Sequence, residues 1–577
     1  MKYIEILAAN KEFSKIINSK KYAIGILSNI TINSLKDILE YQCFKNGINP
    51  SVEIGNYDNI VQDSFIYNNK DLVIIFFDSL SLFENVDHFF ESINSDLYDS
   101  LFSKCINELN LIFKNLEKTP SVIINSFSSL CFVSNSTKTS KIEKFTYELN
   151  TYLQESAPRN FQIVNINKLF SIFGIEKSVD YRFYHSSKAP YTIDFLKKYV
   201  EEIEYVLLKN NGKLKKAIIF DCDNTLWGGI LGEDGIDNID MSISSKTGKY
   251  YNMIQRIIVY LSQKGVIIGL CSKNNENDVL EVFKVHKDTY LKEENIVIHK
   301  INWSDKASNL LSISEELNIG LDSIIFVDDS SFEINLIRQK LPEITTIQVP
   351  ANLYLYPTSL LKTIYKYFNL DVTDDDLKKT SMYKEQFQRT IEKNKFNNID
   401  QYLASLEIEI TIEKNNINQV ERLAQLTQKT NQFNLTTKRY TEVQIQNFIL
   451  NKQFHVFSLS VRDKFGDNGI TGLCIINEFE DHTGSILSID TFLLSCRIIG
   501  RNIEYEFLNV ILNSFQNKNV KEVRSIYIPS NKNEQVKDFF EKSNFNLISS
   551  KIEKKYFLKF DSINKNKVSY IRVNFNN

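Results

Sequence analysis

Four features are missing from this chain of 577 residues, and each absence argues against a class of protein. The seven cysteines are odd in number and include no C-x-x-C pair, which argues against a disulfide framework and against a zinc site. No apolar run approaches the roughly 18 residues that a membrane span needs. The 68 basic residues do not exceed the 71 acidic ones, so there is no basic footprint for nucleic acid. The first residues form no signal-peptide core, because Glu5 and Lys11 interrupt it. We therefore expect a cytoplasmic protein with neither nucleic acid nor a membrane as partner.

The composition is that of a soluble globular protein, with 43% hydrophobic and 24% charged residues. At roughly 100–200 residues per domain, the length predicts three or four domains. Changes in the pattern of elements place the boundaries at 1–210, 211–355 and 356–577.

The first range alternates short strands with amphipathic helices, which predicts a doubly wound α/β layer. A long helix over Thr192–Leu208 and the polar linker Lys209–Lys216 end it. The predicted strands are Tyr22–Leu27, Ser51–Gly55, Leu72–Phe77, Ser121–Asn125 and Phe161–Ile166.

The segment Lys216–Gly235 reads KAIIFDCDNTLWGGILGEDG and is the most informative part of the chain. Its apolar start, Ala217–Phe220, predicts a buried strand that ends on Asp221 and Asp223. Two like charges at the end of a buried strand repel each other and are partly desolvated. A divalent cation removes that cost, so Asp-x-Asp-x-Thr, ending at Thr225, indicates a magnesium-dependent phosphoryl site.

Four further strands continue the α/β rhythm, with Gly265, Ser304 and Gly320 as expected helix caps or stops. The predicted strands are Val266–Leu270, Ile296–His299, Ser323–Val327 and Thr345–Val349. In open parallel sheets, ligands bind beyond the carboxyl ends of the strands. The polar residues expected at that edge, besides the two aspartates, are Ser272, Lys306, Asp328 and Asp329.

These segments (FDCDNTLWGGILGEDG, CSKNN, SDK and FVDDSSFE) together resemble the haloacid dehalogenase (HAD) superfamily, and its FkbH-like branch in particular. The resemblance implies that Asp221 attacks phosphorus and that Asp223 is the general acid/base and gives its backbone carbonyl to Mg²⁺. It further implies that Ser272, Lys306 and Thr225 bind the phosphoryl group, that Asp221 and Asp328 ligate the metal, and that Asp329 stands behind them.

The segments between these motifs leave no room for a separate cap domain, which favours a macromolecular or carrier-bound partner over a small free metabolite. The FkbH-like resemblance implies transfer of a glyceryl unit from 1,3-bisphosphoglycerate to the phosphopantetheine arm of an acyl carrier protein, with loss of phosphate, in polyketide or related pathways. That route passes through an enzyme thioester. Cys222 is one candidate for the thiol and Cys271 another, although Cys222 reads equally well as a buried packing residue.

The last range becomes antiparallel after Phe454, with turns expected at Gly466–Gly469 and Asp481–Gly484. Its strand Ile486–Leu494 leads to a short Arg/Gly segment and a helix, in a pattern that resembles the pyrophosphate cradle of GNAT acetyltransferases. The resemblance implies that Arg497, Gly500, Arg501 and Asn502 bind an acyl-pantetheine group; Asp490 is a candidate base.

The first range resembles SGNH hydrolases through Ser28–Asn29, Asn125 and the pair Asp180 and His185, and a structural or docking role is the preferred interpretation. The expected fold class is therefore α/β and multidomain: a doubly wound SGNH- or flavodoxin-like domain, a HAD-like Rossmannoid core without a large cap, and an α+β GNAT-like domain. A plain magnesium phosphatase, an acetyltransferase with a structural HAD part and a scaffold without chemistry remain open alternatives.

Overall fold

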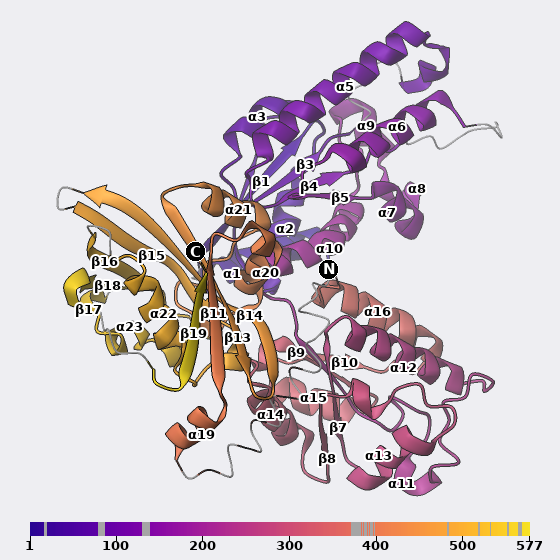
Figure 1. Ribbon diagram of the computed structural model, residues 1–577. Helices are drawn as coiled ribbons and strands as arrows, with labels where there is room; N and C mark the ends of the chain where they lie inside the picture. Colours follow the sequence, from indigo (N-terminus) through magenta and orange to yellow (C-terminus); the bar gives the residue numbers. More distant parts are fainter. Residues whose placement is uncertain are drawn as a thin grey trace. The chain divides into compact units, whose positions relative to one another are not determined.

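The computed structural model describes 1–16, 20–78, 87–129, 139–370, 398–481, 484–516, 520–530, 532–550, 553–562 and 568–576 (Figure 1). Five single positions between 382 and 396 are also described. Cys131 lies outside this part, as do most of the residues of 374–395. The chain forms two compact units, Met1–Asn211 with Tyr440–Ile445, and Gly212–Arg439 with Gln446–Asn577.

The first unit contains a five-stranded parallel sheet in the order β2-β1-β3-β4-β5. The strands are β1 Lys21–Ser28, β2 Asn49–Ile54, β3 Leu72–Phe76, β4 Val122–Asn125 and β5 Phe161–Val164. The helices are α1 Tyr3–Ile16, α2 Ser34–Lys45, α3 Ile60–Ile66, α5 Ser95–Leu116, α6 Lys141–Ser156, α7 Ile166–Phe173, α8 Ile175–Ser178, α9 Tyr181–Ser187 and α10 Ile193–Asn210.

Helices cover both faces of this sheet because successive side chains of a strand point to opposite faces. Ile74 and Phe76 pack in one core with α2 and α10, whereas Val73 and Ile75 pack in a second core with α5 and α6. The doubly wound layer predicted from the sequence is confirmed.

The second unit begins with another five-stranded parallel sheet, in the order β10-β9-β6-β7-β8. Its strands are β6 Ala217–Phe220, β7 Ile267–Ser272, β8 Ile298–Ile301, β9 Ile324–Asp328 and β10 Thr345–Gln348. Helices α12 Gly248–Gln263, α13 Glu276–Val285 and α16 Tyr356–Tyr367 share a core with one face, and α14 Lys306–Leu317 and α15 Ser331–Lys340 with the other.

Two of the expected helix signals in this sheet are wrong by one or two residues. Asp305, not Ser304, caps α14, because its carboxylate accepts from the backbone N–H of Ser308 (3.1 Å). Asn318, not Gly320, takes the left-handed conformation that ends the helix, with φ of 50°. Gly265, which follows the C-cap residue Lys264 of α12, does have the expected positive φ of 71°.

The rest of the second unit is a mixed sheet in the order β17-β18-β16-β15-β14-β13-β11-β19, with β12 paired to β15. The strands are β11 Ile408–Lys414, β12 Phe433–Asn434, β13 Phe454–Asp463, β14 Gly466–Asp481, β15 Gly484–Leu494, β16 Val520–Tyr527, β17 Asn546–Ser550, β18 Lys554–Lys559 and β19 Ile571–Asn576. The longer helices in this part of the chain are α19 Ile399–Ser405, α20 Val420–Lys429, α21 Glu442–Leu450 and α22 Ile503–Asn513, and the short α23 is Phe539–Lys542.

The turn expected at Gly466–Gly469 is wrong. The two residues before Gly466 make the turn, and β14 starts at Gly466 itself. Gly469 has φ of 64° beside a shift of register against β13, so its conformational freedom serves a bulge in the strand.

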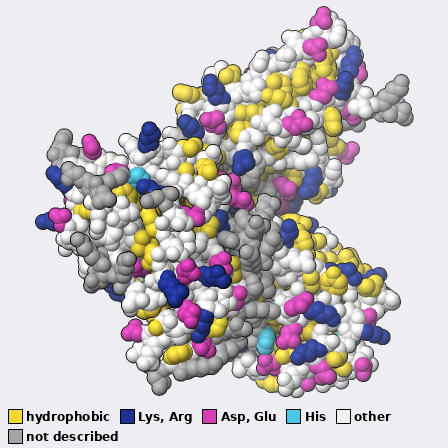
Figure 2. All heavy atoms as spheres, viewed as in Figure 1, with side chains coloured by type: hydrophobic (Ala, Val, Ile, Leu, Met, Phe, Trp, Pro, Cys, Tyr) yellow, Lys and Arg dark blue, Asp and Glu magenta, His cyan; other side chains and the backbone are white. Residues whose placement is uncertain are grey.

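The predicted α/β, multidomain class is confirmed, and the domain limits at residues 210 and 355 stay predictions. None of the helices in the described part combines the length and apolar character that crossing a membrane requires. On the face of the molecule in Figure 2, lysine and arginine side chains are interspersed with aspartate and glutamate.

Candidate active site at the edge of the second sheet

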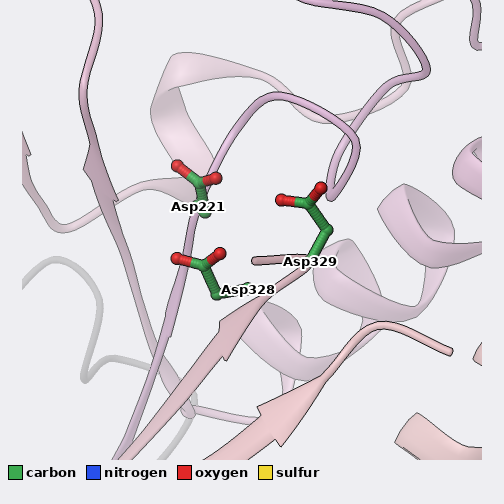
Figure 3. A group of neighbouring side chains, drawn as sticks. All are labelled: Asp221, Asp328 and Asp329. Atoms are coloured by element: carbon green, nitrogen blue, oxygen red, sulfur yellow. The ribbon is translucent and has the colours of Figure 1, made fainter. Parts of the chain in front are cut away.

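Three carboxylates meet where β6 and β9 end. Asp221 follows β6, Asp328 is the last residue of β9, and Asp329 comes next. The two strands are parallel neighbours, and Asp221 donates its backbone N–H to the carbonyl of Val327 (2.9 Å), which sets the two strand ends side by side. One oxygen from each carboxylate lies within 4.8 Å of the others, and Figure 3 shows the three groups turned toward a common space.

A buried lysine joins two of these carboxylates. The ammonium Nζ of Lys306, the first residue of α14, lies 3.1 Å from Asp221 Oδ1 and 2.7 Å from Asp328 Oδ2. All three side chains are less than a tenth exposed. Three carboxylates against one ammonium leave two negative charges without a partner within this cluster, which is the charge of one divalent cation.

The acid–base equilibria show the cost of this arrangement. Burial, together with the charge of Asp221, raises the pKa of Asp328 to about 7. Burial also raises the pKa of Asp221, against the opposing effect of Lys306, and raises the pKa of Asp329. For Lys306, the two carboxylates outweigh burial and raise the pKa of the ammonium. The lysine is therefore charged and the carboxylates are short of positive charge.

The donor set fits magnesium, which prefers carboxylate oxygens and retains several waters. In the Asp-x-Asp-x-Thr segment, the hydroxyl of Thr225 is fully buried and finds no hydrogen-bond partner among the described residues. An oxygen of Asp329 lies within 4.8 Å of one oxygen each of Asp221 and Asp328, and whether Asp329 ligates the metal or stands behind the ligands stays a prediction. Which of these residues bind the metal or the phosphoryl group stays a prediction.

Asp223 is held apart from the three-carboxylate group by three hydrogen bonds. Its Oδ1 accepts from the indole Nε1 of Trp227 (2.9 Å) and from the backbone N–H of Leu231 (3.0 Å). Its Oδ2 accepts from the amide Nδ2 of Asn274 (2.9 Å). The same amide donates to the hydroxyl of Ser272 (3.2 Å), the buried last residue of β7.

Sequence reasoning did not assign roles to Trp227 and Asn274, although both lie inside the segments that carry the resemblance. Trp227 is four residues after Asp223, and Asn274 is two residues after Ser272. Their distance along the chain from Asp223 and Ser272 could have placed both residues near the strand ends. Only the approach of the two loops in the structure lets both side chains donate to the carboxylate of Asp223.

The two cysteines named as thiol candidates are both buried. Cys222 packs with Phe220 and Leu226 in the core on one face of the sheet, and Cys271 packs in the core on the other. Burial, followed by the charge of Asp221, raises the pKa of the Cys222 thiol, and burial likewise raises the pKa of the Cys271 thiol. Among the six described cysteines, Cys496 alone is partly exposed. A thiolate at this edge is therefore disfavoured in this conformation.

Between β15 and α22, the two arginines of the expected cradle point into the protein. Arg501 donates to Asp463 Oδ2 (2.9 Å), and Arg497 donates to the sulfur of Met382 (2.6 Å) and to the backbone carbonyl of Asn468 (3.4 Å). Both guanidinium groups are buried. They are held by internal partners, so an acyl-pantetheine group would have to use the neighbouring backbone.

That backbone has unusual conformations. Gly500 has φ of 81°, and apart from its two chain neighbours no described residue has an atom within 4 Å of the point where a Cβ would stand. Asn502, which precedes α22, has φ of 61°, and its amide donates to the hydroxyl of Tyr570 (2.7 Å). Asp490, the candidate base, pairs with Lys438. Binding of pantetheine here stays a prediction.

The polar residues named in the first unit are engaged in local hydrogen bonds. The Ser28 hydroxyl donates to the carbonyl of Ile30 (2.8 Å), and Asn29 exchanges two hydrogen bonds with the backbone of Asp78. Asn125 accepts from the backbone N–H of Phe77 (3.2 Å). These contacts hold loops at the carboxyl edge of the first sheet.

Asp180 caps α9 and pairs with Arg182 (2.7 Å), in an exposed contact. His185 lies in α9, and its side chain is outside the described part of the structure. The geometry favours the structural interpretation of these residues.

Comparison with known proteins agrees with a phosphatase-type fold in part of the chain. The chain is similar to the crystal structure of the N-terminal part of the protein BF1531 from Bacteroides fragilis, which contains a phosphatase domain complexed with Mg. The identity is 25% and the TM-score 0.55, over 64% of this chain and 100% of that one.

Acetyltransferase structures give much weaker matches. An N-acetyltransferase from Staphylococcus aureus Mu50 is 19% identical over 27% of this chain and 99% of its own, with a TM-score of 0.21. A spermidine N-acetyltransferase from Vibrio cholerae is 12% identical over 26% and 94%, also at 0.21. These scores carry no argument about the C-terminal sheet. No family model matches the chain, and no curated protein matches it.

Proposed function

We propose that this chain is a magnesium-dependent phosphoryl-transfer enzyme whose nucleophile is Asp221. The observation that carries the proposal is the meeting of Asp221, Asp328 and Asp329 around Lys306 at the carboxyl edge of a parallel sheet. The magnesium-bound phosphatase domain of the Bacteroides fragilis protein supports it. Magnesium, when bound by these carboxylates, neutralises charge on the phosphoryl oxygens.

The residues of the chain then have distinct roles. A carboxylate oxygen of Asp221 attacks phosphorus, and the bond from phosphorus to the leaving oxygen breaks. Lys306 and Ser272 hold the phosphoryl oxygens, while Asp223 protonates the leaving oxygen. Water then hydrolyses the aspartyl phosphate, giving its proton to Asp223, so the enzyme returns to its starting state and inorganic phosphate is released.

The FkbH-like resemblance supports a finer proposal, in which the donor is 1,3-bisphosphoglycerate and a glyceryl group is loaded onto an acyl carrier protein. The balance of bonds formed and broken then requires two different nucleophiles. Attack of Asp221 on the acyl phosphate would release a free carboxylate and waste the activated acyl group. A thiol must therefore attack the acyl carbon and expel that phosphate, while Asp221 removes the phosphate ester at the other end of the molecule.

The small size of the segments around the site is consistent with a carrier-bound substrate. Between Asp223 and α12, the described chain forms only the four-residue helix α11 (Leu231–Asp234), and between β7 and β8 it forms α13 and a single 3₁₀ turn. Neither insertion has a sheet of its own, so nothing there forms a separate lid. In this proposal the thiol is the phosphopantetheine thiol of the carrier, or a cysteine reached after rearrangement, and the backbone before α22 holds the arm.

The test is incubation of the chain with Mg²⁺, 1,3-bisphosphoglycerate and a phosphopantetheinylated carrier, followed by intact-protein mass spectrometry and phosphate assay. The proposal predicts a carrier that gains one glyceryl mass and two phosphates released per glyceryl. Asp221→Asn should leave the carrier either unloaded or with one additional phosphate mass. A carrier that gains a glyceryl group unchanged with Asp221→Asn would overturn the assigned chemistry.

The alternative with a specific observation in its favour is a plain magnesium phosphatase, because both candidate cysteines are buried. In that case phosphate is released from the donor and the carrier mass never changes. If phosphate release depends on Asp221 and the wild-type chain, with all its cysteines, never loads the carrier, the protein is a phosphatase.

A further inference from the structure

The carboxylate of Asp223 already has most of its hydrogen-bonding capacity in use. An ionised carboxylate offers about four acceptor positions on its two oxygens. Oδ1 takes two donors, from Trp227 and Leu231, and Oδ2 takes one, from Asn274. Among the described residues these are its partners, so the acceptor position that remains lies on Oδ2.

The oxygen that handles the proton is therefore the one that Asn274 holds. The Asn274 side chain is 5% exposed, and one amide nitrogen reaches both Asp223 Oδ2 (2.9 Å) and the Ser272 hydroxyl (3.2 Å). It thus connects the residue assigned to proton transfer with a residue assigned to the phosphoryl group. An amide fixed by two contacts has little freedom to swing away.

We infer that Asn274 is a positioning residue. It directs Oδ2 of Asp223 toward the leaving oxygen and fixes the position of Oδ2 relative to the Ser272 hydroxyl. The inference rests on the proposed function, because it concerns the same site. When the bond from phosphorus to the leaving oxygen breaks, Oδ2 gives its proton to that oxygen. It takes a proton back from the water that hydrolyses the aspartyl phosphate.

The neighbouring residue provides a matched control. Asn275 also carries an amide and is the last residue of the same loop, directly before α13, but its oxygen accepts from the indole Nε1 of Trp303 (3.2 Å), whose side chain is exposed. The chain has two tryptophans, so each asparagine is coupled to a different indole. Trp227 reports on Asp223, and Trp303 reports on Asn275.

The experiment uses full-length chain labelled with ¹⁵N-tryptophan and compares Asn274→Ala, the isosteric Asn274→Asp and Asn275→Ala. Trp303→Phe assigns the two indole N–H signals. Asn274→Ala should move the Trp227 signal and leave that of Trp303, and Asn275→Ala should do the reverse. Thermal unfolding shows that each variant is folded.

Phosphate release from acetyl phosphate and from 1,3-bisphosphoglycerate is measured on the same samples. We expect kcat to fall about 10- to 100-fold in Asn274→Ala with KM changed less than about threefold. Asn274→Asp should fall further, because it puts a second carboxylate against Asp223. Asn275→Ala should keep its kcat.

An unmoved Trp227 signal, or a wild-type kcat in either Asn274 variant, would overturn the inference. If the wild-type chain releases no phosphate from either donor, the proposed function fails. The catalytic part of the inference then fails too. The indole signals still show whether Asn274 holds Asp223 in place.

Discussion

The described part of the chain contains two five-stranded parallel sheets, and polar side chains lie at the carboxyl edge of both. The two edges differ in whether the hydrogen bonds and charges of these side chains are balanced by partners. At the first sheet, Ser28 and Asn29 are neutral and bond to nearby backbone. At the second, Asp221 and Asp328 share one lysine and still leave negative charge over.

This difference separates a structural edge from a reactive one. A buried neutral group that is fully hydrogen-bonded stabilises its loop and has no capacity left for a ligand. Buried charge without compensation costs free energy, and the protein retains it only where a cation or substrate offsets it. Location at the carboxyl edge is therefore necessary for a site but not sufficient.

The largest effect is expected for Asp221→Asn. Removing the nucleophile should lower phosphate release by about 10³-fold or more. The same change removes a buried charge that repels Asp328, so the variant should unfold at a higher temperature than the wild type when no Mg²⁺ is added. Assay and calorimetry measure the two effects, and an inactive variant that is also less stable would contradict this account of the charge balance.

Lys306→Met should destabilise the protein strongly. It leaves Asp221 and Asp328 buried without their shared partner, and breaking a buried pair in this way costs about 3–5 kcal/mol. Denaturant unfolding measures the loss. Saturating Mg²⁺ should restore part of it, because the cation replaces the missing positive charge; an equal loss with and without Mg²⁺ would argue against a metal at this position.

Removal of magnesium should have a moderate effect that depends on pH. Without the cation, the folded-state pKa of Asp328 is raised to about 7, so the folded protein binds protons more tightly than the unfolded chain. Its stability therefore falls as pH rises from the unfolded-state pKa toward 7. Mg²⁺ binds the ionised form, so the increase in melting temperature on adding it should be larger at about pH 8 than at about pH 6. The reverse order would exclude these carboxylates as ligands.

The smallest effect is expected for Ser28→Ala. Loss of its hydrogen bonds to the Ile30 backbone should cost about 1 kcal/mol and leave phosphate release unchanged. Equilibrium unfolding and an esterase assay with p-nitrophenyl acetate test it. If the wild type cleaves the ester and Ser28→Ala does not, the first edge is also reactive and the contrast between the two sheets fails.

Most of the two parallel sheets could be predicted because their strands are continuous apolar runs between turn residues. The strand expected at Val266–Leu270 is found at Ile267–Ser272, and that expected at Ser323–Val327 at Ile324–Asp328. Helix ends were less predictable, as Ser304 and Gly320 show, because residues one or two positions away could make the same cap.

By itself, the sequence determined which residues reach the carboxyl edge of the second sheet: strand length and period place Asp221, Ser272 and Asp328 there whatever their neighbours are. Only the tertiary structure decided which carboxylates lie together around Lys306 and which one is bound by other partners. Asp329 joins the group around Lys306, while Trp227, Leu231 and Asn274 hold Asp223 apart. The reason is that these partners come from loops after different strands, and which donor reaches which oxygen depends on how the loops cross rather than on any local pattern.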